Sequence, residues 1–239
     1  MQGRGTYISL SAYFLVIALL FVITFGGSRA ITVVSQQPAS AERTCFVIDA
    51  GHGGVDGGAT SCTGVVESQF NLEIATRLND LMHLLGMKTK MIRTTDVSVY
   101  TSGETIAAKK VSDLKERVRI VNSTENAVLI SIHQNYFSQS QYSGAQVFYG
   151  SNDFGRQLAQ GMQSEFKATV NKGGHREAKK ASGIYLLEHV QCPAILIECG
   201  FLSNPVEEEL LRSAQYQKKI CCVISGISSQ YALVNGTSS

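Results

Sequence analysis

The sequence predicts an α/β fold, a three-layer sandwich with a mostly parallel central sheet and helices on both faces. Short apolar runs alternate along the chain with longer amphipathic runs, which is the pattern of strand–helix–strand units. The 239 residues, 44% apolar and 17% charged, suit one good-sized domain. Polar groups also recur where apolar runs end, as expected at the C-terminal edge of a parallel sheet.

The chain begins with an apolar segment, and residues 7–25 contain no charged side chain. As a helix they span roughly 28 Å, close to the thickness of a bilayer core. We therefore expect one transmembrane or signal helix within residues 1–25, either an uncleaved anchor or a cleaved signal peptide. In both cases the rest is exported. Small and polar residues in 26–43 predict a linker, followed by a domain over 44–233 and a tail over 234–239.

The domain opens with a predicted strand, the apolar run Cys45–Asp49. Ser68 is a candidate cap for the next helix, and Gly86 is expected to end it. Apolar residues recur between them at three- and four-residue steps, at Phe70, Ile74, Leu78, Leu81 and Leu85. Lys88–Arg93 is then expected to be a strand.

The remaining elements follow the same alternation. Apolar spacing predicts helices around Leu114–Val121, over Phe154–Phe166, around Val206–Arg212 and over Ala214–Tyr231. Compact apolar runs predict strands at Ala127–Ile132, Gly144–Tyr149, Ile184–Leu187 and Ala194–Glu198. A net charge of +2 is too small to indicate a nucleic-acid partner, so none is expected.

Six cysteines, at positions 45, 62, 192, 199, 221 and 222, show no CxxC pairing. A thiolate metal site is therefore not supported. Cys45 and Cys199 lie in apolar runs and are expected to act as small core residues.

Four polar residues stand beside these predicted elements. His52 lies in the glycine-rich turn after the first strand, Glu67 precedes a helix, His133 follows a strand, and Glu198 closes one. Two imidazoles and one carboxylate are a typical ligand set for catalytic zinc, and a second carboxylate can move protons. We expect His52, Glu67 and His133 to bind one zinc ion and Glu198 to be the catalytic carboxylate. Each residue alone has a structural alternative, such as a hydrogen-bonded histidine or a helix-terminal charge.

The segment IDAGHGGVDGGAT, with Glu67 after it, resembles the opening motif of zinc-dependent N-acetylmuramoyl-L-alanine amidases of bacterial cell walls. Later motifs match in order, over about residues 45–233: Arg93-Thr94-Thr95-Asp96, Leu114 with Arg117 and Asn122, SIHQN at 131–135, and IECGFLSN at 197–204. The resemblance implies zinc binding by His52, Glu67 and His133 and catalysis by Glu198. It also implies a peptidoglycan substrate, cut between N-acetylmuramic acid and the L-alanine of the stem peptide.

Within the family, the single domain behind one apolar segment and the stretch GFLSNPVEEELL resemble the spore-cortex amidases. That likeness implies a role in muramic-δ-lactam formation, in the space outside the cytoplasmic membrane or between the forespore membranes, and a lipoprotein partner for some relatives. Two positions depart from the family pattern. Ala50 replaces a proline, which would loosen the turn, and Gln134 replaces a small residue, so that it would crowd the metal or donate to substrate.

Other residues carry weaker expectations. Arg93 and Arg117 would bind the carboxylates of the stem peptide or support the cleft through ion pairs, and Asn135 would bind substrate or fix its own loop. His83, His175 and His189 are expected at the surface. Two other functions remain open, a zinc carboxypeptidase that cuts within peptides and an inactive zinc-bound scaffold.

Overall fold

In the part of the chain that the structure describes, the central sheet has six strands in the order β2-β1-β3-β6-β4-β5. A computed structural model describes residues 44–171 and 174–236 of the chain. The strands are β1 (Cys45–Ala50), β2 (Lys88–Met91), β3 (Ala127–Asn135), β4 (Gln146–Tyr149), β5 (Lys179–Lys180) and β6 (Ala194–Phe201). Among these described strands only β4 and β6 pair antiparallel, and the other neighbours are parallel. The predicted mostly parallel sheet is confirmed.

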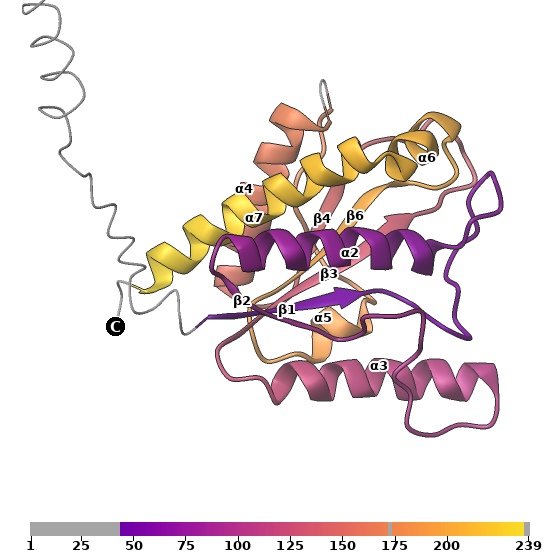
Figure 1. Cartoon of the computed structure of the whole chain (residues 1–239), viewed down its shortest axis with the longest axis horizontal. Coiled ribbons are helices and arrows are strands. Elements are labelled where there is room, and N and C mark those ends of the chain that lie inside the picture. The colour runs from indigo at the N-terminus through magenta and orange to yellow at the C-terminus, as the bar shows by residue number, and fades with distance from the viewer. Residues whose placement is uncertain (1–43, 172–173, 237–239) are drawn as a thin grey trace, which may run out of the picture. The chain divides into compact units, whose positions relative to one another are not determined.

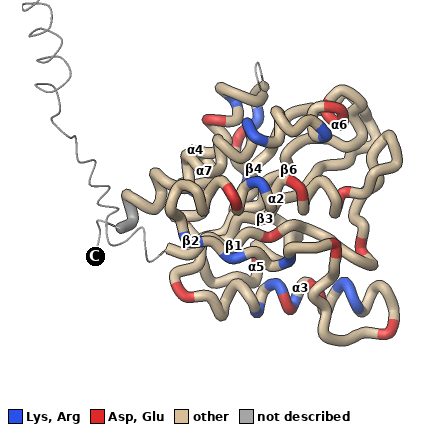
Figure 2. Tube along the Cα trace, in the orientation of Figure 1, with Lys and Arg blue, Asp and Glu red and all other residues tan. Residues whose placement is uncertain are grey.

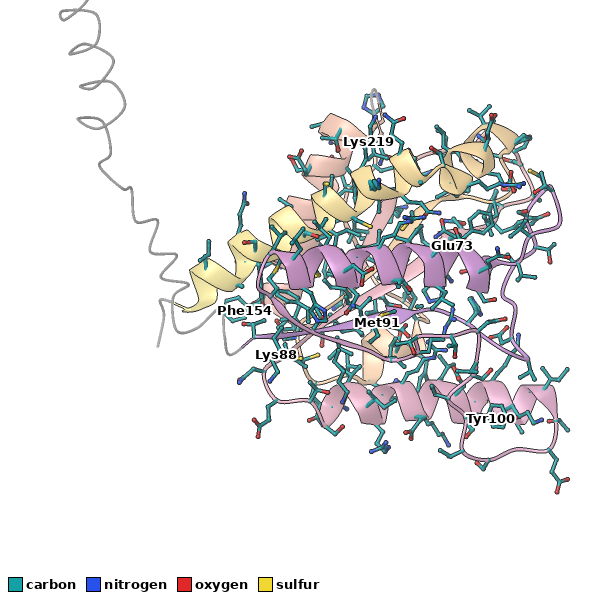
Figure 3. The ribbon with its side chains drawn as sticks, in the orientation of Figure 1. Glu73, Lys88, Met91, Tyr100, Phe154 and Lys219 are labelled. Atoms are coloured by element: carbon teal, nitrogen blue, oxygen red, sulfur yellow. The ribbon has the colours of Figure 1, made fainter. Side chains whose placement is uncertain are left out.

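Helices cover both faces of this sheet, which confirms the three layers (Figure 1). One face carries α2 (Glu67–Leu84), α4 (Asp153–Thr169) and α7 (Ala214–Gly236), with α6 (Pro205–Arg212) packed beside α7. The opposite face carries α3 (Ile106–Asn122) and α5 (Tyr185–His189). Glu73, labelled in Figure 3, ties α2 to α7 because its carboxylate accepts a 3.1 Å hydrogen bond from Gln217.

Apolar side chains form a buried cluster on each side of the sheet. Ile130 and Ile132 of β3 belong to the cluster beneath α2 and α7, whereas Leu129 belongs to the cluster on the α3 side. Because successive side chains of a strand point to opposite faces, His133 shares the side of Leu129. Glu198 pairs with His133 across the β3–β6 register and shares the side of Leu196. The sheet therefore brings these two side chains to one place on the α3 side.

The helix α2 begins at Glu67, two residues before the start that a cap at Ser68 requires. Val66 is its N-cap and makes no side-chain cap bond, so the prediction that Ser68 caps the helix is wrong. Backbone of the preceding loop does that work instead, because Glu67 N–H donates to Ala59 O and Ser68 N–H to Gly57 O. Gly86 ends the helix as predicted: with φ at +76° it donates to His83 O, and Met87 donates to Met82 O.

Two strands extend further than their apolar runs. β3 continues to Asn135, so His133 lies inside its strand and not after it. β6 continues to Phe201, so Glu198 lies inside its strand and not at its end. The ladder continues through His133–Glu198 and, past a bulge, Asn135–Phe201. The predicted strands ended too early because we placed their ends at the first polar residues. Those polar residues still pair with the neighbouring strand.

The predicted strand Ile184–Leu187 is wrong, because these residues begin the short helix α5 instead. Leu186 and Leu187 are both buried against the sheet. A four-residue apolar run does not distinguish a buried strand from one buried helical turn. The two-residue strand β5 was not predicted.

Within residues 44–171 and 174–236, no helix combines the length and the apolar character that crossing a bilayer requires. The predicted membrane or signal helix and the linker lie outside the described residues.

Candidate active site

The turn after β1 has an unusual backbone. His52 adopts a φ of +60°, a region that residues other than glycine rarely enter, and Gly53 and Gly54 follow at +133° and +55°. Two arginines hold this turn through its carbonyl groups. Arg93 Nε donates to Ala50 O at 2.8 Å, and Arg117 Nη2 donates to His52 O at 2.7 Å. The surrounding structure thereby stabilises a conformation that is costly on its own.

The turn brings His52 to Glu67 and His133. Each of the three residues offers one potential ligand atom, a ring nitrogen or a carboxylate oxygen, and these three atoms all lie within 4.8 Å of one another. His52 Nε2 lies 3.3 Å from Glu67 Oε2, and His133 Nδ1 lies 3.0 Å from Glu67 Oε1. Two nitrogens and one carboxylate, with solvent reaching both rings, match the donor set of a catalytic zinc site. The structure thus brings together all three predicted metal ligands.

Gly51 makes this approach possible. A Cβ atom at position 51 would overlap the imidazole ring of His133. The glycine between β1 and His52 is therefore required by the close approach of β3 and not only by the turn.

Electrostatics keeps Glu67 ionised. Burial would raise the pKa of this carboxyl, but hydrogen bonds from His133 and His52 hold it well below its usual range. For His52 burial would lower the pKa, whereas its bonds with Glu67 and Asp56 outweigh burial and raise it to about 9. Glu67 also accepts from the backbone N–H of Ala59 at 3.0 Å. The carboxylate of Glu67 is therefore ionised at neutral pH.

Glu198 differs from Glu67 in its surroundings. Burial raises the pKa of Glu198 to about 7, and the neighbouring charge of Glu67 adds to this while His133 and His52 oppose it. Its Oε2 atom is buried and has no hydrogen-bond partner among the described residues. A carboxyl with a pKa near neutrality, beside a metal-ligand set, is suited to accept and return a proton.

Arg93 and Arg117 are buried, with 3% and 2% of their surface exposed. Besides Ala50, Arg93 donates to the carbonyl oxygens of Gly51, Ser68 and Thr95. Arg117 forms ion pairs with Asp49 and Asp113. Of the two roles predicted for these arginines, the structure places them as supports of the turn, since their guanidinium groups are directed into the protein.

Gln134 points away from the ligand atoms, so the expectation that it crowds the metal or donates to substrate is wrong. Because it alternates with His133 along β3, it lies on the opposite face, buried beneath α2. It donates to Asn71 Oδ1 at 3.2 Å, and Asn71 donates to Glu67 Oε1 at 3.2 Å and to Gly51 O at 3.1 Å. Sequence reasoning missed Asn71, although its position four residues after Glu67 on a helix places the two side by side.

A cleft of about 350 Å³ runs along the α3 side of His52 and His133, and Lys110, Arg117 and Tyr185 are among its lining residues. Basic and acidic residues are interspersed along α3, the helix that forms one wall (Figure 2). A larger groove of about 910 Å³, lined by residues of α4 and α7, lies away from the ligand set. Asn135 is half-buried beyond His133, and its carbonyl accepts from Leu202 N–H at 2.8 Å.

The other candidate residues lie outside this group. His83, His175 and His189 are exposed, as predicted. All six cysteines are free, and Cys45 and Cys199 are buried core residues, also as predicted.

Comparison with known proteins agrees with this geometry. The family model of N-acetylmuramoyl-L-alanine amidase matches residues 46–228. The germination-specific N-acetylmuramoyl-L-alanine amidase of Bacillus subtilis is 34% identical over 228 residues, covering 94% of this chain and 93% of the relative.

Two solved structures share the fold. The CwlD amidase from Clostridioides difficile, in complex with the GerS lipoprotein, is 38% identical with a TM-score of 0.76, covering 80% of this chain and 99% of that one. An N-acetylmuramoyl-L-alanine amidase from Clostridium difficile 630 is 30% identical with a TM-score of 0.68, covering 80% and 97%. The ligand geometry, the family match and these relatives lead to one conclusion: the chain belongs to the N-acetylmuramoyl-L-alanine amidase family of peptidoglycan hydrolases.

Proposed function

We propose that the protein is a zinc-dependent hydrolase that cuts the amide between the lactyl group of N-acetylmuramic acid and the L-alanine of the stem peptide. The single observation that carries this proposal is the convergence of His52, Glu67 and His133 with Glu198 on the neighbouring strand. A zinc ion held by these three ligands supplies a Lewis acid and activates water near neutral pH.

The residues of this chain divide the remaining work. Glu198 accepts a proton from the attacking water and transfers it to the leaving nitrogen. The bond between the lactyl carbonyl carbon and that nitrogen breaks, leaving a carboxylate on the glycan and a free amino group on L-alanine. Arg93 and Arg117 keep the turn of His52 in place, and Asn135 donates a hydrogen bond to the substrate.

We infer a role in the spore cortex, where removal of stem peptides precedes muramic-δ-lactam formation. The name of the Bacillus subtilis relative, a germination-specific amidase, supports this role. The Clostridioides difficile relative was solved with a lipoprotein, which supports a lipoprotein partner here. The apolar segment at 7–25 supports export to the outer face of the cytoplasmic membrane, with that segment as anchor or signal.

The decisive experiment treats intact peptidoglycan with the full-length protein and zinc, with and without a lipoprotein partner, and identifies the products by mass spectrometry. We expect free stem peptides that begin with L-alanine and glycans that carry lactyl carboxylates. Products cut within the peptide would instead indicate a carboxypeptidase. Absence of any product under both conditions would indicate an inactive scaffold.

The metal assignment has its own test. His133→Ala leaves two protein ligands, so we expect it to lose the zinc that the wild type retains after dialysis. Elemental analysis measures this directly. Undiminished zinc in the variant would overturn the ligand assignment.

A further inference from the structure

A chain of polar contacts runs from α3 to the metal-ligand set. Lys110 Nζ lies 2.7 Å from Asp56 Oδ1, and Asp56 Oδ2 lies 2.9 Å from His52 Nδ1. Asp56 also accepts from Gly58 N–H at 3.2 Å. Its backbone is held in a tight turn, because Asp56 and Gly53 exchange two backbone hydrogen bonds of 3.1 and 2.7 Å. The carboxylate is thus fixed from both its backbone and its side chain.

This contact decides which nitrogen of His52 is free. A neutral imidazole carries one N–H and one lone pair, and the partner of the N–H determines where the lone pair lies. When the ring is neutral, as metal binding requires, donation from Nδ1 to Asp56 leaves the lone pair on Nε2, the atom that lies 3.3 Å from Glu67 Oε2. Arg117 already holds the backbone of His52 through its carbonyl. The contact with Asp56 therefore acts on the remaining variables, the orientation and the tautomer of the His52 ring.

His133 presents the opposite nitrogen. Its Nδ1 faces Glu67 at 3.0 Å, whereas His52 faces the same carboxylate with Nε2. The two imidazoles therefore need different tautomers to bind one ion. The contact with Asp56 is specific to the tautomer that His52 requires.

We propose that Asp56, held by Lys110 of α3, is the positioning residue that orients His52 and presents its Nε2 to the metal. This role rests on the proposed zinc site. A carboxylate that accepts the second N–H of a ligating histidine fixes its ring and raises its basicity, and losing such a partner typically weakens metal binding 10–100-fold.

The test uses the full-length protein and compares Asp56→Ala, Asp56→Asn and Lys110→Met with the wild type. Asp153→Asn and Lys115→Met are matched controls at exposed positions on α4 and α3. Zinc dissociation constants are measured by competition with a chelator. Nitrogen-15 spectra of the zinc-loaded protein report which ring nitrogen of His52 carries the proton, a property that a merely structural residue would not control.

We expect Asp56→Ala to weaken zinc binding about 10–100-fold and to remove the Nδ1-protonated signature of His52. Asp56→Asn should weaken zinc binding less, because its amide oxygen still accepts the hydrogen bond from His52 Nδ1. As a single substitution, Lys110→Met should weaken zinc binding. In the double variant with Asp56→Ala it should weaken zinc binding no further, since Lys110 acts through the Asp56 carboxylate. If Asp56→Ala does not fold, Asp56→Asn and Lys110→Met carry the test.

Zinc affinity within twofold of wild type in the folded Asp56 variants would overturn the positioning role while the zinc site stands. A wild type that binds no zinc would overturn the zinc site and the role of Asp56 together. The two failures are therefore distinguishable.

Discussion

At the scale of single residues, the site contains two glutamates with opposite properties. Without a metal, Glu67 accepts hydrogen bonds from both histidines and stays ionised. Burial instead raises the pKa of Glu198 to about 7, and its Oε2 has no hydrogen-bond partner among the described residues. Environments that separate the pKa values of two carboxyl groups assign them different tasks. In the proposed mechanism Glu67 is a metal ligand and Glu198 is the proton carrier.

Replacing Glu198 should therefore separate chemistry from metal binding. We expect Glu198→Gln to lower kcat by roughly 10²–10⁴-fold, since it cannot accept the proton, while zinc content is unchanged. Release of stem peptides and elemental analysis measure the two effects. Glu209→Gln, at an exposed position of α6, is the control. A loss of less than about tenfold would contradict the role of Glu198.

Gly51 offers a second test at this scale. Gly51→Ala introduces a methyl group into the space occupied by the ring of His133, so that ring must move. We expect zinc binding at least about tenfold weaker, the lower end of the cost of misplacing a ligand. Gly226→Ala in α7, where the new Cβ meets open space, should bind zinc as the wild type does. Equal zinc affinity in both variants would show that the ring of His133 is not confined by Gly51.

At the scale of elements, one buried ion pair joins a strand to a helix. Asp49 of β1 pairs with Arg117 of α3, and both side chains are at most 2% exposed. Ser131 of β3 donates to the same carboxylate at 2.6 Å, and Asp113 accepts from Arg117 Nε at 2.6 Å. The network fixes α3 against the sheet directly beneath the turn of His52, and it thereby also places Lys110.

Breaking this pair should destabilise the domain strongly. Asp49→Asn removes the buried carboxylate that pairs with Nη1 of Arg117 and leaves Asp113 as the remaining ion-pair partner. We expect a loss of about 3–5 kcal/mol in the free energy of unfolding. Arg117→Met should cost a similar amount, and the double variant should lose less than the sum of the two. Urea denaturation measures these values.

The solvent-accessible pair Glu116–Arg119 on the same helix is the control. Glu116→Gln should leave the unfolding midpoint nearly unchanged, because surface ion pairs contribute little. A similarly small change in Asp49→Asn would contradict the structural weight given to the buried pair.

At the scale of the whole molecule, the fold shifts the pKa values of several site residues, and these shifts make the stability of the metal-free protein depend on pH. The pKa values of Glu67 and Asp49 are lowered, Asp49 because Arg117, His133 and Ser131 outweigh its burial. The pKa values of Glu198 and His52 are raised, to about 7 and about 9. The two sets act on stability in opposite directions as the pH changes.

We expect the metal-free protein to be most stable near about pH 5. Below about pH 4, protonation removes the stability contributed by Glu67 and Asp49, whose folded pKa values are depressed. Above that pH, Glu198 loses its contribution as pH rises to about 7, and His52 loses its own between about 6.5 and about 9. Urea midpoints in a chelator, measured from about pH 3 to 9, test this profile.

Added zinc should abolish the alkaline decline, because the ion replaces the proton of His52 and binds more tightly as pH rises. His52→Ala should flatten the same limb without metal. A metal-free protein whose stability rises between about pH 6.5 and 9 would contradict the pKa assigned to His52.

The order of most elements could be predicted because apolar periodicity reflects burial directly. The four candidate site residues could also be named, because they stand beside predicted strands and helices and match the motifs of a known family in order, although each alone has a structural alternative. The predictions were wrong where a short stretch of sequence suits two local structures and contacts with distant residues decide between them. The cap of α2 comes from loop backbone, α5 packs a run that also suits a strand, and Gln134 faces α2 because β3 continues past His133.

The sequence by itself thus determined the fold class, the family and the residue types available for chemistry. Only the tertiary structure decided how those residues face one another: Nε2 of His52 but Nδ1 of His133 toward Glu67, Arg93 and Arg117 beneath the turn, and Asp56 behind His52. The physical reason is the distance along the chain over which each property is determined. Periodicity and residue type are local properties, whereas ring orientation, burial and pKa depend on contacts between residues that are far apart in the chain, such as His52 and His133, which 81 positions separate.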